Sequence, residues 1–187
     1  MKSPRPWSRG CSGVTLIESM IVVVLLALCA TVATPTFVAW RVRDQIDARA
    51  GALLGTLAYA RGEAIRRQTR IIVCRIDAQR NCLAAGAACP SSGLLDWSCG
   101  WAVMAGSEGA WRPLRIQSGL DEIGVASPLT NIAFTPPAGQ AIGTLRHFEV
   151  APRASSVAPA KDGRWRRCIR IASGGRARIS DGLCEAS

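Results

Sequence analysis

Residues 13 to 18 read Gly13-Val14-Thr15-Leu16-Ile17-Glu18, and residues 19–40 after them carry no charged side chain. An apolar run of this length can cross a bilayer core, which needs about 20 residues. Placing an acidic side chain such as Glu18 in a membrane costs roughly 2.5–3.5 kcal/mol of free energy, so we expect Glu18, at the start of this run, to have a function. An ordinary signal peptide has its small-residue cleavage site after the apolar stretch, whereas Gly13 lies before it. The stretch therefore predicts a leader (residues 1–13) ahead of an apolar helix.

The helical pattern continues beyond the apolar run. Between Ile46 and Ile65 apolar residues recur at steps of three and four, and charged residues, Arg49 and Glu63 among them, mostly fill the other face. This pattern is typical of an amphipathic helix. Pro35 should bend the helix without ending it, because lipid or neighbouring helices can cover the freed carbonyl. We expect a transmembrane half (residues 14–40) followed by an amphipathic half (residues 41–68).

Beyond Gln68 the chain changes to short apolar segments separated by turns rich in Gly, Pro and Ser. The segments rich in β-branched and aromatic residues are 70–76, 100–105, 111–116, 131–134, 144–150, 166–172 and 176–180. Such a series predicts antiparallel sheets. The chain is therefore expected to be an α+β protein, with the long helix packed on a β-rich globular domain (residues 69–187).

Charge and cysteine content indicate the possible binding partners and the cellular compartment of this chain. The formal net charge of +10 suits a polyanion or a membrane surface, but it is equally compatible with solubility alone. Basic residues before the apolar run favour a cytoplasmic leader, so the domain beyond it would lie in an oxidising periplasm. Six cysteines in that domain favour disulfides, and the C-x-x-C spacing of a zinc site is absent. We expect no metal and no cofactor.

The combination of Gly13, Glu18 and Pro35 resembles a type IV prepilin. In that family a membrane peptidase cuts after the glycine, and the new first residue, here Val14, is methylated. The fifth mature residue is a glutamate, here Glu18, and a proline is common at the position of Pro35. The resemblance implies a single-pass inner-membrane protein that joins other pilin subunits in a fibre. Prepilin peptidase would be a second partner.

The part of the chain beyond the helix resembles the FimT/GspH family of minor pilins and pseudopilins. The likeness is carried by Val73-Cys74 with Trp97 and Gly100-Trp101, by 132–136 with Gly139, and by 167–171 with 175–179. The resemblance implies the pilin fold and a structural role, in a pilus or in a secretion pseudopilus. The additional cysteines Cys89 and Cys99 depart from the usual family pattern.

The segment Gly175-Arg176-Ala177-Arg178 carries the most specific functional expectation. In FimT-type minor pilins a G-R-x-R motif near the carboxy terminus binds DNA during natural transformation, and the resemblance gives that role to Arg176 and Arg178. Two arginines at a spacing of two point to one face of a strand and can bind successive phosphates of double-stranded DNA. The nearby basic residues, expected to contribute less, are Lys161, Arg164, Arg166, Arg167 and Arg170. The other interpretation is a solvated edge that protects an exposed strand.

Several alternatives remain open at this level. Six cysteines allow many pairings. We expect Cys168–Cys184, which would enclose the arginine segment, together with Cys74–Cys82 and Cys89–Cys99. The competing functions are a GspH-like pseudopilin of a type II secretion system and a membrane-anchored periplasmic enzyme. The enzyme interpretation is weak, because the lone His147 has no second candidate base near it in sequence.

Overall fold

The computed structural model describes residues 14–84, 86–89, 95–106, 110–143, 146–153 and 163–184, without the side chains of residues 32–36. It forms two compact units, Met1–Val38 and Ala39–Ser187, which are treated separately below. Helix α1 spans Leu16–Arg67. It begins where the Glu18 amide donates to Thr15 Oγ1 at 3.3 Å, a normal N-terminal cap. It ends at Gln68, whose φ of 52° lies in the left-handed region.

In the first unit, α1 presents apolar side chains to the surroundings, among them Leu16, Ile21 and Leu28. The helix continues through Pro35 without a break. Among the residues whose placement is described, no helix combines the length and the apolar character needed to cross a membrane. The transmembrane half expected over residues 14–40, which includes residues 32–36 without described side chains, stays a prediction.

In the second unit, α1 buries one apolar stripe. Its members are spaced three or four residues apart, so they share one face of the helix; they are Ile46, Ala50, Leu53, Leu57, Ala60 and Ala64. The amphipathic pattern of the sequence correctly predicted this face. Arg49 and Glu63 are exceptions, because both are buried although the pattern placed them with the solvated residues.

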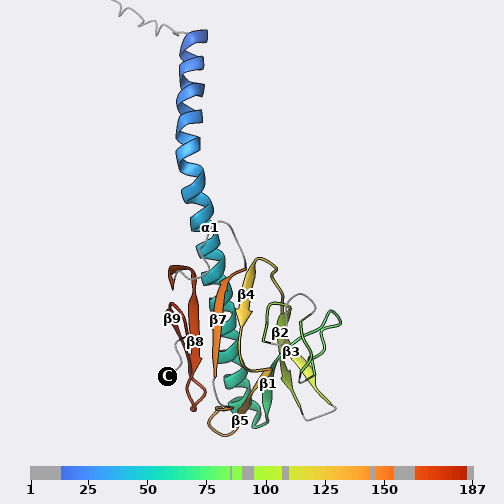
Figure 1. The fold of residues 1–187 in the computed structure, drawn as a ribbon. Helices are drawn as coiled ribbons and strands as arrows, with labels where there is room; N and C mark the ends of the chain where they lie inside the picture. The colour runs from blue at the N-terminus through green and yellow to red at the C-terminus, as the bar shows by residue number, and fades with distance from the viewer. Residues whose placement is uncertain are drawn as a thin grey trace, which may run out of the picture. The chain divides into compact units, whose positions relative to one another are not determined.

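Two antiparallel sheets pack with this stripe (Figure 1). The first has the order β3-β2-β1-β5-β6 and the second the order β4-β7-β8-β9. The strands are β1 (Ile71–Arg75), β2 (Gly100–Ala105), β3 (Arg112–Ser118), β4 (Ile123–Ala126), β5 (Asn131–Thr135), β6 (Gln140–Ile142), β7 (His147–Pro152), β8 (Arg167–Ile171) and β9 (Ala177–Asp181). A short 3-10 helix, η1 (Gly163–Trp165), precedes β8.

The main core is shared by α1 and both sheets. Trp97 and Phe148 meet edge to face at its centre, with ring centroids 4.8 Å apart. A smaller cluster around Ile72, Cys74 and Met104 covers the other face of the first sheet. The α+β class predicted from the sequence is thus confirmed. Strands β4 and β6 were not predicted, because at four and three residues they are too short to show a pattern of their own.

Three disulfides are present, and they are the pairs expected from the sequence. Cys74–Cys82 joins β1 to the loop after it, and Cys89–Cys99 joins the following loop to the start of β2. Cys168–Cys184 joins β8 to the segment that follows β9. The hairpin that carries the arginine motif is therefore closed by a covalent link at its base.

Candidate nucleic-acid interface

The β8–β9 hairpin presents the motif predicted to bind DNA. In its turn the Gly175 amide donates to the Ala172 carbonyl at 2.8 Å, and the Ala172 amide donates to the Arg176 carbonyl at 3.0 Å. Gly175 has a φ of 77°, which a side chain would strain. The turn thus needs a glycine directly before Arg176.

Three exposed arginines meet on this hairpin. Arg170 of β8 lies directly opposite Arg178 of β9 in the strand register, and Arg176 lies two residues before Arg178. All three line one hollow of about 430 Å³, together with Ile171, Ala172, Ile179 and Ser180. Like charges placed directly opposite each other on paired strands are destabilising, and a bound anion would offset that repulsion. The hollow is therefore suited to phosphate groups.

The structure changes the list of supporting cations. Arg164 in η1 is exposed. Arg166 forms an ion pair with Glu149. Arg167 is only 5% exposed, and its Nε atom lies 2.6 Å from Asp47 and 3.2 Å from Asp181. Arg167 was expected to support DNA binding, but its side chain is buried and paired with Asp47 of α1 and Asp181 of β9, which leaves almost no surface for contact with DNA.

Three further residues belong to this part of the sequence: Arg170 and Lys161, which were expected to support DNA binding, and Trp165. Arg170 was expected to contribute less than Arg176 and Arg178, yet the register makes it their direct neighbour. Strand pairing is the reason, and a single sequence does not reveal it. Trp165 packs partly against the main core, so its indole has a structural role. Lys161 lies outside the described residues.

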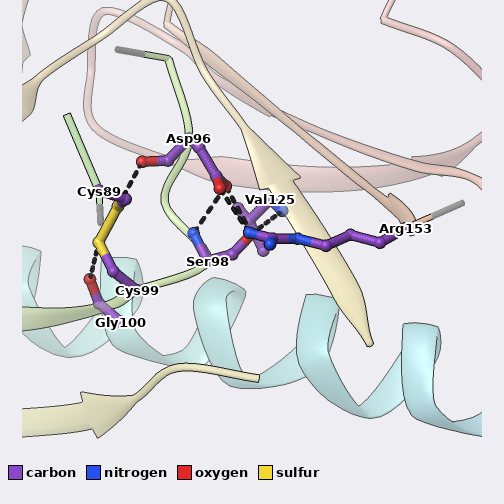
Figure 2. Close-up of polar contacts among 7 residues, drawn as sticks. All are labelled: Cys89, Asp96, Ser98, Cys99, Gly100, Val125 and Arg153. Atoms are coloured by element: carbon purple, nitrogen blue, oxygen red, sulfur yellow. Dashed lines mark hydrogen bonds and ion pairs between the residues drawn. A yellow bond between two sulfur atoms is a disulfide. The ribbon is translucent and has the colours of Figure 1, made fainter. Parts of the chain in front are cut away.

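A second polar site lies between the loop before β2 and strand β4 (Figure 2). Asp96 accepts hydrogen bonds from the amide and the hydroxyl of Ser98 at 2.8 and 2.5 Å, and it pairs with Arg153 at 2.5 Å. Ser98 Oγ in turn accepts from the Val125 amide at 3.0 Å. These contacts hold the loop against the edge of β4, so we assign them a structural role.

The hollow beside this network has a volume of about 510 Å³ and is lined by both the Asp96–Arg153 and the Glu149–Arg166 ion pairs. The acidic and basic side chains that line this hollow are therefore paired with one another. In the described part of the chain no group of His, Cys, Asp and Glu side chains could hold a metal ion.

Arg49 is one of the buried charges that sequence reasoning missed. Its guanidinium lies 3.9 Å from the centre of the Trp101 ring, and Nη1 donates to the Ser118 carbonyl at 2.8 Å. Nε and Nη2 are buried without a hydrogen-bond partner. Burial away from water lowers the pKa of Arg49 to about 10. Arg49 thus links α1 to the ends of β2 and β3.

The amino-terminal motif is only partly described. Gly13 lies outside the described residues, whereas Val14 is exposed just before α1. Glu18 is exposed in the first turn of α1, where a carboxylate interacts favourably with the positive end of the helix dipole.

Comparison with known proteins defines the class. The prokaryotic N-terminal methylation motif matches residues 8–34, which include Gly13 and Glu18. Two crystal structures of the type IV minor pilin FimU from Pseudomonas aeruginosa (strain PAO1) are similar in fold. The P21 form has a TM-score of 0.51 and 18% identity over 74% of this chain and 90% of that chain. The P65 form has a TM-score of 0.49 and 18% identity over 72% and 91%. The chain is a type IV pilin-like protein.

The family is also defined. The model of the type II transport protein GspH matches residues 49–175, more than half of the chain. The chain therefore belongs to the GspH family of minor pilins and pseudopilins. Membership in this family implies assembly with other pilin subunits and processing by prepilin peptidase. A search of curated proteins gave no significant match.

Proposed function

We propose that this chain is a FimT-like minor type IV pilin that captures double-stranded DNA with the β8–β9 hairpin. It would be held in the inner membrane by its amino-terminal helix before assembly, with the disulfide-bonded domain in the periplasm. The observation that carries the DNA proposal is the set of three exposed arginines, Arg170, Arg176 and Arg178, around one hollow. Guanidinium groups bind phosphate with two parallel hydrogen bonds, so we expect these arginines to contact the DNA backbone and to bind independently of base sequence.

The anchoring of the hairpin supports the same proposal. The disulfide Cys168–Cys184 closes the base of the hairpin, and the contact between Arg167 and Asp47 joins that base to helix α1. A fixed presentation lowers the ordering cost that flexible arginines would incur on binding. The hairpin is therefore suited to hold DNA while the fibre moves.

A gel shift with duplex DNA across a salt series tests this function on the full chain in detergent. The logarithm of the affinity should fall with the logarithm of salt, with a slope of about −0.9 per phosphate contacted. The double variant Arg176→Gln/Arg178→Gln should lose most of the binding and flatten the slope by roughly one per arginine removed.

The matched control is Arg112→Gln/Arg115→Gln, which removes the same charge from exposed positions of β3. If both double variants bind DNA equally well, binding reflects overall charge and the hairpin is only a solvated edge. Two oligonucleotides of unrelated sequence should give the same result.

A pseudopilin of a type II secretion system is the second candidate, and the description of the matching family favours it. The two functions differ in what a deletion strain loses. Loss of DNA uptake with normal protein secretion supports the pilin, whereas loss of secretion with normal DNA uptake supports the pseudopilin.

A further inference from the structure

The turn of the arginine hairpin is attached to helix α1 by one side chain. Arg61 of α1 donates from Nε to the Gly174 carbonyl at 3.2 Å and from Nη2 to the Ala138 carbonyl at 3.3 Å. The first carbonyl belongs to the hairpin turn, and the second to the turn between β5 and β6. One guanidinium therefore joins three segments that are far apart in sequence.

The three segments also fit together closely. A Cβ atom on Gly175 would lie 1.9 Å from the Gly139 carbonyl oxygen, and a Cβ atom on Gly139 would lie 2.7 Å from Cγ of Arg61. The Ala141 amide donates to the Ser173 carbonyl at 3.1 Å, so strand β6 holds the same turn. The backbone just before Arg176 is thus held in one position, and Arg61 contacts it from one side.

Arg61 is not among the residues that line the hollow with Arg170, Arg176 and Arg178. Its Nε and Nη2 atoms donate to backbone carbonyls. A planar guanidinium suits two carbonyls at once, whereas a lysine ammonium on a flexible stem offers a single point charge. The contact therefore depends on the shape of arginine as well as on its charge.

We infer that Arg61 is a positioning residue for DNA capture: it holds the hairpin turn so that Arg176 and Arg178 reach phosphate together. This inference rests on the proposed function. It also gives Gly175 a second role, since the glycine permits close approach to Gly139 as well as the turn conformation.

The test uses Arg61→Lys in the full chain in detergent, because lysine keeps the charge and with it the long-range attraction to DNA. The affinity for duplex DNA should fall about two- to tenfold, the cost of ordering one or two loosened side chains. Arg43→Lys is the matched control, since Arg43 is an exposed arginine of the same helix, and its affinity should equal that of the parent.

A double-variant comparison separates positioning from general stability. With Arg176→Gln/Arg178→Gln already present, adding Arg61→Lys should cause no further loss, because the groups it positions are gone. Amide exchange supplies an independent measure. The Ala141 amide should exchange faster in Arg61→Lys, while the amides of β8 stay protected.

Each outcome decides the question. Unchanged affinity of Arg61→Lys, or an equal loss in Arg43→Lys, overturns the inference and leaves the proposed function intact. If the parent chain does not bind DNA, both the inference about Arg61 and the proposed function are wrong. If Arg61→Lys does not fold, Arg61→Gln replaces it with Arg43→Gln as its control, and equal affinities of that pair overturn the inference.

Discussion

Arg167 of β8 and Asp47 of α1 form a link between helix and hairpin, with Nε of the arginine 2.6 Å from Oδ1 of the aspartate. Arg167 is almost fully buried, whereas the Asp47 side chain is 48% exposed. The remaining carboxylate, on Asp181, is more distant and more exposed. Asp47 is therefore the main partner of a cation that has left water.

Asp47→Asn should lower the free energy of unfolding, because it leaves the buried Arg167 with one distant carboxylate. Loss of a fully buried partner costs about 3–5 kcal/mol, and the exposure of Asp47 reduces the expectation to about 1–2 kcal/mol. Urea denaturation measures the change, with Asp44→Asn at an exposed position of the same helix as the control. Equal stability of the two variants would show that the link contributes nothing.

Glu63 near the end of α1 should make stability depend on pH. Hydrogen bonds from Arg66 and then Arg67 lower the pKa of this carboxyl to about 2, from an ordinary value of 4.5. Because the pKa of Glu63 is lower in the folded than in the unfolded state, its ionised carboxylate stabilises the fold above pH 4.5. This contribution is lost as the pH falls toward 2. Glu63→Gln should therefore be less stable than the parent at pH 7 and approach it near pH 2.

The Glu63 measurement is a series of urea titrations between those pH values. Glu122→Gln on an exposed loop is the control and should show no comparable convergence. A stability difference for Glu63→Gln that stays constant down to pH 2 contradicts the assignment.

The Cys168–Cys184 disulfide should stabilise the domain and the DNA contact together. It closes a loop with a sequence separation of 16, and loops of that size contribute about 3 kcal/mol. Cys168→Ser/Cys184→Ser should unfold at lower urea concentration and bind DNA more weakly. Reduction of the parent with dithiothreitol is a useful second arm, because it opens all three disulfides and should have a larger effect. A variant with parental stability would contradict this prediction.

Processing is predicted to occur between Gly13 and Val14. Mass spectrometry of protein isolated from the membrane should find a mature chain that begins with N-methylated Val14. Replacing Gly13 with a bulky residue should leave the leader attached, because the cleavage site requires a small side chain. An intact leader in assembled fibres would rule the prediction out.

Glu18 is predicted to act in assembly. In a fibre its carboxylate would pair with the positive amino terminus of a neighbouring subunit, which offsets the cost of desolvation. Glu18→Ala should insert into membranes normally and fail to enter pili, as measured by immunoblotting of sheared fibres. Normal incorporation argues against the pairing, and an uncleaved variant would show that Glu18 serves the peptidase instead.

The sequence by itself determined most of the elements, although not the short strands β4 and β6. The apolar run, the amphipathic stripe from Ile46 to Ala64 and the β-branched segments are local patterns, and their periods specify a long helix and antiparallel strands. The motif at Gly175-Arg176-Ala177-Arg178 is equally visible in the sequence, because the glycines before it predict a turn and two arginines at a spacing of two predict a shared strand face. These features are therefore readable from one chain.

Only the tertiary structure decided which neighbours those elements acquire. Arg170 joins Arg178 because of strand register, Arg167 leaves the surface because β8 turns it toward Asp47, and Arg61 reaches two turns that lie far along the chain. In the sequence all three are simply arginines in basic segments. Arg61 contacts carbonyls 113 and 77 residues further along the chain, and Arg167 of β8 reaches a carboxylate of α1, so both depend on how the sheets pack on α1. The pairing of Arg170 with Arg178 depends on the register of β8 and β9.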